Sequence, residues 1–372
     1  MFQDKHVFFV NIEDNFIYLN VDALIYRAGV EPSNIVIVFF GKSDGFYKVR
    51  KIVGVEYFLF DYINIKDVIF SKTITFISIN ANNASYISKI IDIDACVCDK
   101  TYILITDDEV ERWGRCVDVH GAIKKDKALN ISSEEVEVTS KIKWFIGNSN
   151  TFGDKIRNAL KRNDFKLINA GIIFDTLPVN ESNCFSDLLS RCEAWNGKEK
   201  KILIGTKKKS FSIREVKAVM RSLCKFKLGE EYKVLIMWHK KNRKQRLLLD
   251  LYTIWLRHFK QQTLDISYVT ELSPLAYTSL ISSCSHIILQ KRGGASTVRT
   301  YLKFGAGVVC IPSGTDNEFG FKRALDLDVI SFDSTDDLMK KIINSKIDIK
   351  YNESCTRMEE LRSASVLSML YN

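Results

Sequence analysis

The chain of 372 residues is 46% hydrophobic and carries a formal net charge of +9, which excludes a disordered protein and favours anionic partners. Its length predicts two domains of about 150 to 200 residues each. No run reaches about 18 apolar residues, no signal peptide is visible, and the nine cysteines lack metal-ligand spacing. We therefore expect a cytoplasmic protein, soluble or peripheral on the inner face of the membrane, without a bound metal.

Strand-like apolar runs alternate with polar or helical segments through the first half. They are His6–Val10, Ile35–Phe40, Ile74–Ile79, Tyr102–Ile105 and Trp144–Ile146. Continuous apolar runs, rather than strict alternation, indicate strands covered on both faces and hence a mostly parallel sheet. In such sheets ligands bind beyond the carboxyl ends of the strands. Acidic residues follow two of these runs, at Glu13–Asp14 and at Asp107–Glu109.

The second half repeats this pattern. Its expected strands are Lys201–Ile204, Lys233–Met237, Ile266–Val269, His286–Leu289, Val308–Ile311 and Val329–Phe332, with helices over 213–226, 246–261 and 274–283. The residues after these strands could converge on one cleft. We therefore predict an α/β protein with two Rossmann-like domains joined near residues 176–199.

The segment after His286–Leu289 is the most informative part of the chain. Arg292, Gly293 and Gly294 follow a strand, and Ser296 or Thr297 is expected to cap the next helix. Glycines and a cation at a helix start suit an anion, most plausibly a phosphate, although they can equally form a simple tight turn with a solvated arginine. Neither G-x-G-x-x-G nor G-x-x-x-x-G-K-[ST] occurs, which disfavours a dinucleotide fold and a P-loop.

Several segments of the second half resemble bacterial glycosyltransferases of the GT-B type, in particular the dTDP-4-acetamido-4,6-dideoxygalactose (Fuc4NAc) transferase family. The matching segments are 201–206, 232–238, the run 270–302 and 307–312. In that family glutamines and a Gly-Asn pair follow the arginine, whereas Gly-Gly-Ala-Ser-Thr follows Arg292 here. This departure leaves the donor nucleotide and its sugar open.

The resemblance implies two Rossmann-like domains facing a central cleft. Residues 1–185 would bind the acceptor, 186–200 would be a linker, 201–350 would bind the donor, and 351–372 would form a C-terminal helix near the domain interface. The implied reaction moves a sugar from a nucleotide-diphosphate donor to a glycan or lipid-linked glycan during synthesis of a bacterial surface polysaccharide. It needs no metal or other cofactor, and we expect it to invert the anomeric centre.

Donor contacts are expected at the strand ends of the second half. Besides Arg292 and the two glycines, the candidates are Thr206, Lys207, His239, Glu271, Ser296, Thr297, Ser313 and Asn317. Such enzymes often place a group like Glu271 on the ribose or base, and residues like Ser313 and Asn317 near the donor sugar. Arg292 and the amides after Gly294 would stabilise the leaving diphosphate.

An inverting transfer needs a general base for the acceptor hydroxyl. Asp107 and Asp108 are the preferred candidates, although Thr106 and these acids could merely cap a helix. Glu13 and Asp14 are rivals, and His120 is a third choice. Asp92-x-Asp94 has the spacing of a metal ligand pair, but its context suggests an alternating surface strand.

Two other functions remain open, a polysaccharide pyruvyl transferase on a similar scaffold and a non-catalytic nucleotide-sugar or nucleic-acid binding protein. Many cations lie between Lys200 and Arg246. They favour an anionic membrane surface or sugar-nucleotide phosphates, unless they simply form a solvated face. Nucleic acid is disfavoured because no aromatic platform or reading helix accompanies them.

Overall fold

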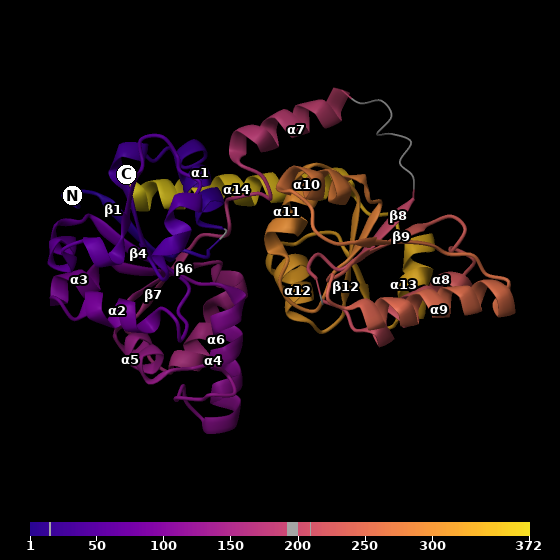
Figure 1. Cartoon of the computed structure of the whole chain (residues 1–372), viewed down its shortest axis with the longest axis horizontal. Coiled ribbons are helices and arrows are strands. Elements are labelled where there is room, and N and C mark those ends of the chain that lie inside the picture. The colour runs from indigo at the N-terminus through magenta and orange to yellow at the C-terminus, as the bar shows by residue number, and fades with distance from the viewer. Residues whose placement is uncertain (15, 192–199, 209) are drawn as a thin grey trace. The chain divides into compact units, whose positions relative to one another are not determined.

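The computed structural model describes residues 1–14, 16–191, 200–208 and 210–372 (Figure 1). They divide into unit 1, Met1–Phe174 with Glu360–Asn372, and unit 2, Asp175–Glu359. The sequence analysis placed the end of the first domain at residue 185, but unit 1 ends at Phe174. The segment after Phe174 belongs to unit 2 because it forms hydrogen bonds within that unit. For example, the Thr176 N–H donates to Thr300 Oγ1 at 3.1 Å. Of the expected linker, 186–191 are helical and 192–199 lie outside the described residues.

Unit 1 contains a seven-stranded parallel sheet in the order β3-β2-β1-β4-β5-β6-β7. The strands are β1 (His6–Asn11), β2 (Ile35–Phe40), β3 (Glu56–Leu59), β4 (Thr73–Ile77), β5 (Thr101–Leu104), β6 (Trp144–Gly147) and β7 (Lys166–Asn169). His6 in the central strand pairs with Ile35 on one side and Thr73 on the other. The five expected strands are confirmed. The sequence analysis missed β3 and β7, which are short edge strands whose residues are half-buried or exposed.

Helices connect these strands and cover the sheet (Figure 1). They are α1 (Ile17–Tyr26), α2 (Ala84–Ile91), α3 (Ala95–Asp99), α4 (Asp107–His120), α5 (Ser133–Lys141) and α6 (Ser149–Leu160), with 3-10 turns at Pro32–Asn34, Ser43–Lys48, Phe60–Tyr62 and Ile65–Phe70. The wholly buried Trp113 of α4 belongs to the same core as Phe76 and Phe145 of the sheet. Burial of such large apolar side chains is the main stabilising contribution to the unit.

Unit 2 contains a six-stranded parallel sheet in the order β10-β9-β8-β11-β12-β13. The strands are β8 (Lys201–Ile204), β9 (Lys233–Met237), β10 (Asp265–Val269), β11 (His286–Ile288), β12 (Val308–Pro312) and β13 (Ile330–Phe332). All six expected strands are confirmed, with ends that move by at most one residue. Their apolar runs are easily read because most of these strands are covered on both faces.

The helices of unit 2 pack on both faces of its sheet. They are α7 (Val179–Arg191), α8 (Ile213–Lys225), α9 (Arg243–Lys260), α10 (Pro274–Ser283), α11 (Ala295–Lys303), α12 (Asp316–Glu318), a π-helical turn (Phe319–Ala324) and α13 (Thr335–Asn344). Residues of α8, α9 and α13 share one core, whereas those of α10 and α11 share the other. Helix α14 (Ile349–Tyr371) belongs to unit 2 up to Glu359 and to unit 1 from Glu360.

Within the described ranges, none of the helices combines the length and the apolar composition needed to span a lipid bilayer.

Candidate functional site

The strand order of unit 2 reverses between its neighbouring strands β8 and β11. Such a reversal opens a crevice at the carboxyl ends of parallel strands, and ligands bind there. Thr206 follows β8 and Gln290 follows β11. Gln290 Oε1 accepts a hydrogen bond from the Thr206 N–H at 3.1 Å, while Gln290 Nε2 donates to the Gly293 carbonyl at 2.9 Å. One buried amide side chain therefore ties the two loops together.

Gly293 and Gly294 turn the chain from β11 into α11, with φ angles of +78° and +91°. A Cβ on Gly294 would lie 2.6 Å from Thr206 Oγ1 and 2.9 Å from Gln290 Nε2. The position therefore needs glycine for both its backbone conformation and its close packing. Helix α11 begins directly after Gly294, so the prediction that Ser296 or Thr297 caps it was wrong. Both residues lie in its first turn, because the glycine pair lets the helix start earlier.

Further hydrogen bonds hold this turn in place. The Tyr277 hydroxyl donates to the Thr206 carbonyl at 3.0 Å and lies 3.0 Å from Thr297 Oγ1. Burial raises the pKa of Tyr277 to about 12, so the hydroxyl keeps its proton at neutral pH. Asn317 Nδ2 donates to the carbonyls of Gln290, at 2.6 Å, and Gly293, at 3.1 Å. Thr297 and Asn317 thus support the loop with their buried side chains.

The start of α11, like that of α9, has no side-chain cap, and in this it differs from three other helices of unit 2. Ser212, Ser273 and Ser334 each accept a hydrogen bond from a first-turn N–H of α8, α10 and α13. Gly294 has no side chain, and no side-chain cap is present at α11. The N–H groups of its first turn and the helix dipole are therefore suited to an anion. The half-buried Arg292 precedes the glycine pair.

The other predicted donor residues lie at the same edge, because every strand of the sheet runs in one direction. Lys207 follows β8 and is exposed, and His239 follows β9 with its Nδ1 accepting from the Lys241 N–H at 3.2 Å. Ser313 follows β12, and its N–H donates to the Phe332 carbonyl at 2.8 Å. The structure therefore gathers these residues at one edge, and Thr206, Thr297 and Asn317 join the Gln290 network.

Glu271 follows β10 and is paired with two lysines. Its carboxylate lies 2.5 Å from Lys240 Nζ and 3.5 Å from Lys208 Nζ. The hydrogen bond and charge of Lys240, followed by the charge of Lys208, lower the pKa of Glu271. These exposed pairs contribute little to stability, but they place cations at the same edge of the sheet.

Sequence reasoning missed Gln290 and Tyr277 as members of this site. Gln290 could have been found, because it is a polar residue at the end of an apolar strand, directly before the cation and the glycines. Tyr277 gives no such signal. It lies inside a helix, and only the tertiary fold brings its hydroxyl to Thr206.

In unit 1, Asp107 and Asp108 occupy the first turn of α4, at the carboxyl end of β5. Thr106 begins the helix in a capping box with Glu109, whose Oε1 accepts from the Thr106 N–H at 2.8 Å. The capping partner is therefore Glu109 and not Asp107. Asp108 pairs with Arg112 at 3.1 Å, whereas Asp107 is half-buried.

Glu109 is a carboxyl group that the sequence analysis did not single out. Its side chain is wholly buried, and this burial raises its pKa to about 7. Oε2 accepts hydrogen bonds from the hydroxyls of Thr106 and Ser78, the latter at 3.3 Å. Ser78 follows β4 in a left-handed conformation, with φ of +66°. Strained residues of this kind cluster at functional sites.

The rival bases occupy different settings. Glu13 is exposed after β1, while Asp14 Oδ1 accepts from the N–H groups of Phe16, at 2.6 Å, and Ile17, at 3.2 Å. Asp14 therefore holds the turn that leads into α1, and burial raises its pKa. His120 ends α4 and lies 3.0 Å from Asp126. A helix of 14 residues is about 21 Å long, so His120 lies near the opposite edge of the sheet from Asp107.

The Asp92-x-Asp94 pair lies in a turn between helices and not in a surface strand, so that prediction was wrong. Asp92 ends α2, and Asp94 caps α3 by accepting from the Cys96 N–H at 2.8 Å. Within the described part of the chain, no cluster of three or more His, Cys, Asp or Glu side chains could hold a metal.

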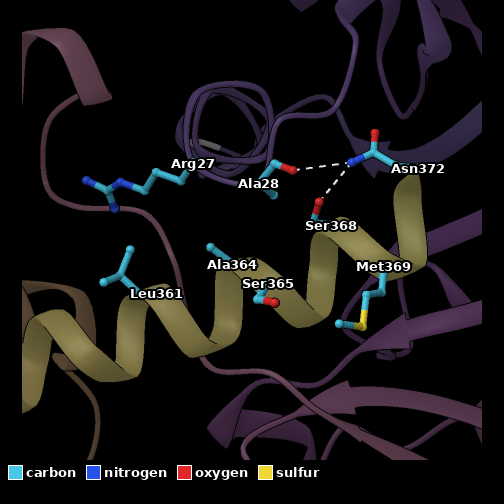
Figure 2. A pocket seen from close by; sticks show the side chains of 8 residues that line it. All are labelled: Arg27, Ala28, Leu361, Ala364, Ser365, Ser368, Met369 and Asn372. Atoms are coloured by element: carbon cyan, nitrogen blue, oxygen red, sulfur yellow. Dashed lines mark hydrogen bonds between the residues drawn. The ribbon is translucent and has the colours of Figure 1, made fainter.

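A pocket of about 500 Å³ lies in unit 1 between the end of α1 and the last turns of α14 (Figure 2). Asn372 is one of the lining residues, with its Nδ2 donating to Ser368 Oγ at 2.9 Å and to the Ala28 carbonyl at 3.4 Å. Helix α1 runs back from the carboxyl end of β1, so its last turn lies toward the other edge of the sheet. None of the predicted site residues lines this pocket.

Comparison with known proteins adds evidence on the fold. No family model and no curated protein matches the sequence. Among solved structures, HepE from Anabaena in complex with UDP and glucose matches over 99% of this chain and 94% of its own, with a TM-score of 0.54 and 7% identity. The α,α-trehalose 6-phosphate synthase from Burkholderia multivorans matches over 99% and 97%, with a TM-score of 0.55 and 7% identity.

A UDP-GlcNAc 2-epimerase from Methanocaldococcus jannaschii is also similar, with a TM-score of 0.53 and 12% identity over 95% of this chain and 99% of its own. The likenesses extend over both units. Together with the two parallel sheets, they show that the chain has the GT-B fold. At these identities they show the fold alone, and the function must be argued from the site.

Proposed function

We propose that this protein is a glycosyltransferase that takes its sugar from a nucleotide-diphosphate donor bound to unit 2. The start of α11 carries this proposal. It lies at the strand-order reversal, it has no side-chain cap, and Gln290, Tyr277 and Asn317 fix the preceding turn. The fold supports the same conclusion, because the similar HepE structure contains UDP and glucose.

The donor diphosphate would lie against the first-turn N–H groups of α11. Arg292 would neutralise the charge that develops on the diphosphate as the bond to the sugar breaks. Lys207, His239 and Ser313 lie at the same edge of the sheet for contacts with the phosphates and the sugar. Glu271 would bind the ribose or base after exchanging a lysine partner for a hydroxyl group.

Unit 1 would bind the acceptor. During transfer the acceptor oxygen bonds to the anomeric carbon, the bond to the diphosphate breaks, and a carboxylate takes the hydroxyl proton. Asp107 is the preferred base over Asp108, because the carboxylate of Asp108 is held by Arg112. Glu13 remains the rival. We propose an inverting transfer that uses no metal.

We also propose a glycan or lipid-linked glycan as the acceptor, in the synthesis of a bacterial surface polysaccharide at the inner face of the membrane. The net charge of +9 supports an anionic surface as a partner. This location suits a lipid-linked acceptor, which cannot leave the bilayer.

Thermal unfolding with UDP, dTDP, GDP and ADP tests the donor site. A nucleotide that binds only the folded state at 100 times its dissociation constant adds about 2.7 kcal/mol to the free energy of unfolding. We expect a diphosphate to raise the unfolding temperature and the matching nucleoside to do so much less. Equal unfolding temperatures with all four nucleotides and with buffer would contradict the proposal.

Turnover separates the remaining alternatives. A nucleotide-sugar epimerase is the second candidate, because one similar structure is a UDP-GlcNAc 2-epimerase. An epimerase would invert a sugar carbon without an acceptor, and a glycosyltransferase would release the nucleoside diphosphate as the acceptor gains mass. Transfer of a pyruvyl group from an enolpyruvyl donor to the acceptor would indicate a pyruvyl transferase, while binding without any turnover would indicate a non-catalytic protein.

A further inference from the structure

Helix α9 of unit 2 exposes an apolar face. Only Leu249 and Leu256 of this helix are buried. Six large apolar side chains of the same helix are between 41% and 76% exposed, namely Leu247, Leu248, Leu251, Ile254, Trp255 and Phe259. We define these six residues as the α9 face.

The α9 face is one continuous stripe. At 100° per residue, its members lie within about 140° of each other around the helix, on the side away from Leu249 and Leu256. Along the axis they span 247–259, or about 18 Å at 1.5 Å per residue. Single exposed leucines are common on soluble proteins, but a contiguous apolar stripe of this size marks an interaction site.

Cations accompany this stripe. The helix carries Arg243, Lys244, Arg246, Arg257 and Lys260 against a single acid, Asp250, which gives it a charge of about +4. Asp250 accepts a hydrogen bond from the Tyr268 hydroxyl at 2.8 Å and lies 3.8 Å from Arg246, and its side chain is 44% exposed beside these cations. By helical position, Lys244 lies among the apolar residues and Arg243 and Arg257 lie along one side of them.

The aromatic residue at the stripe is suited to an interface between apolar and polar phases. Trp255 stacks on Tyr252 with ring centroids 5.7 Å apart, and Lys260 Nζ lies 5.7 Å from the Trp255 ring. A half-exposed indole of this kind fits the headgroup level of a bilayer, and the neighbouring cations can reach lipid phosphates.

We infer that the α9 face docks unit 2 onto an anionic lipid surface, with α9 lying in the plane of the membrane interface. Apolar side chains on one face and flanking cations are the signature of such helices. Self-association across this face is disfavoured, because two copies would bring their cations together. The inference rests on the membrane location in the proposed function, but it identifies the contacting surface independently of the donor site.

Sedimentation with vesicles tests this inference. We expect the protein to sediment with vesicles of phosphatidylcholine and phosphatidylglycerol, to stay in solution with phosphatidylcholine alone, and to be released by salt. The triple variant Leu247→Ser, Leu251→Ser, Phe259→Ser should lower the partition coefficient by about tenfold or more. The matched control is a triple variant that removes three exposed apolar side chains outside α9, Leu188→Ser, Leu361→Ser, Met369→Ser. It should bind anionic vesicles like the wild type.

The charge contribution has its own matched pair. Two triple variants each lower the net charge by three. The first, on α9, is Arg243→Gln, Lys244→Gln, Arg257→Gln, and the second, outside α9, is Lys124→Gln, Lys125→Gln, Lys127→Gln. The first should weaken binding by about a hundredfold, and the second should do so much less. Equal losses from both would show non-specific attraction and overturn the assignment to α9.

Two other results would also overturn the inference. One is a wild-type protein that ignores anionic vesicles, and the other is a serine triple variant that binds them fully. If size-exclusion chromatography instead shows a dimer that the serine variant converts to a monomer, the face is a self-association interface. Nucleotide-induced thermal shifts should be unchanged in all α9 variants, so a failure of the donor site is recognised separately.

Discussion

Replacing Gly294 with alanine tests whether the loops after β8 and β11 form one rigid unit. A left-handed backbone costs a non-glycine residue about 1 to 2 kcal/mol. The new Cβ would also lie 2.6 Å from Thr206 Oγ1 and 2.9 Å from Gln290 Nε2, so these groups must move. Their movement would break the bonds from Gln290 Nε2 to Thr206 Oγ1 and to the Gly293 carbonyl, both 2.9 Å long. At about 1 kcal/mol for each bond, the total loss is about 3 to 4 kcal/mol.

Gly314→Ala is the matched control. Gly314 has a φ of +70°, but a Cβ added there would have no atom within 4 Å, so this variant should lose only the backbone contribution of about 1 to 2 kcal/mol. Urea unfolding followed by circular dichroism measures the loss, and UDP-induced thermal shifts measure binding. Combining Thr206→Ala with Gly294→Ala should relieve part of the strain. The double variant should therefore lose about 1 kcal/mol less in the free energy of unfolding than the sum of the two single variants. If Gly294→Ala and Gly314→Ala are equally destabilised, the close packing does not constrain the turn.

Three further outcomes are expected. Arg292→Ala should weaken nucleoside diphosphate binding more than tenfold, by about 1.5 to 3 kcal/mol in calorimetric titration, and unchanged affinity would remove Arg292 from the site. Asp107→Asn should lower turnover about a hundredfold with little change in donor affinity, and Glu13→Gln should lower turnover less. A larger loss of turnover for Glu13→Gln than for Asp107→Asn in steady-state assays would favour Glu13 as the base. Because the pKa of Glu109 rises from 4.5 to about 7 on folding, the folded state binds more protons between these values and stability falls as pH rises through them. Glu109→Gln keeps a capping side chain but cannot ionise. Relative to the wild type, its free energy of unfolding should therefore increase by up to about 3 kcal/mol between pH 4.5 and pH 8. If urea unfolding gives the same pH dependence for both proteins, this reasoning is wrong.

The amino-acid sequence by itself determined the sheets and much of their helical cover. Apolar runs such as Lys201–Ile204 and Val308–Ile311 are read easily because strands buried on both faces have few polar positions. The edge strand β3 escaped detection because its residues are only half-buried. The Arg292–Gly294 turn was also visible, since two adjacent glycines directly after an apolar run indicate that the strand ends there.

Only the tertiary structure decided which residues act together. Gln290 and Thr206 are far apart in the chain, and the strand order places β8 beside β11 and so brings them into contact. The same applies to Glu109, whose pKa is raised by complete burial and whose Oε2 accepts a hydrogen bond from Ser78, which follows another strand. Periodicity along the chain indicates which face of a helix or strand is buried, but it does not indicate which loops meet. That pairing follows from strand order, because the favourable energy of the contacts is gained only once the sheet has formed.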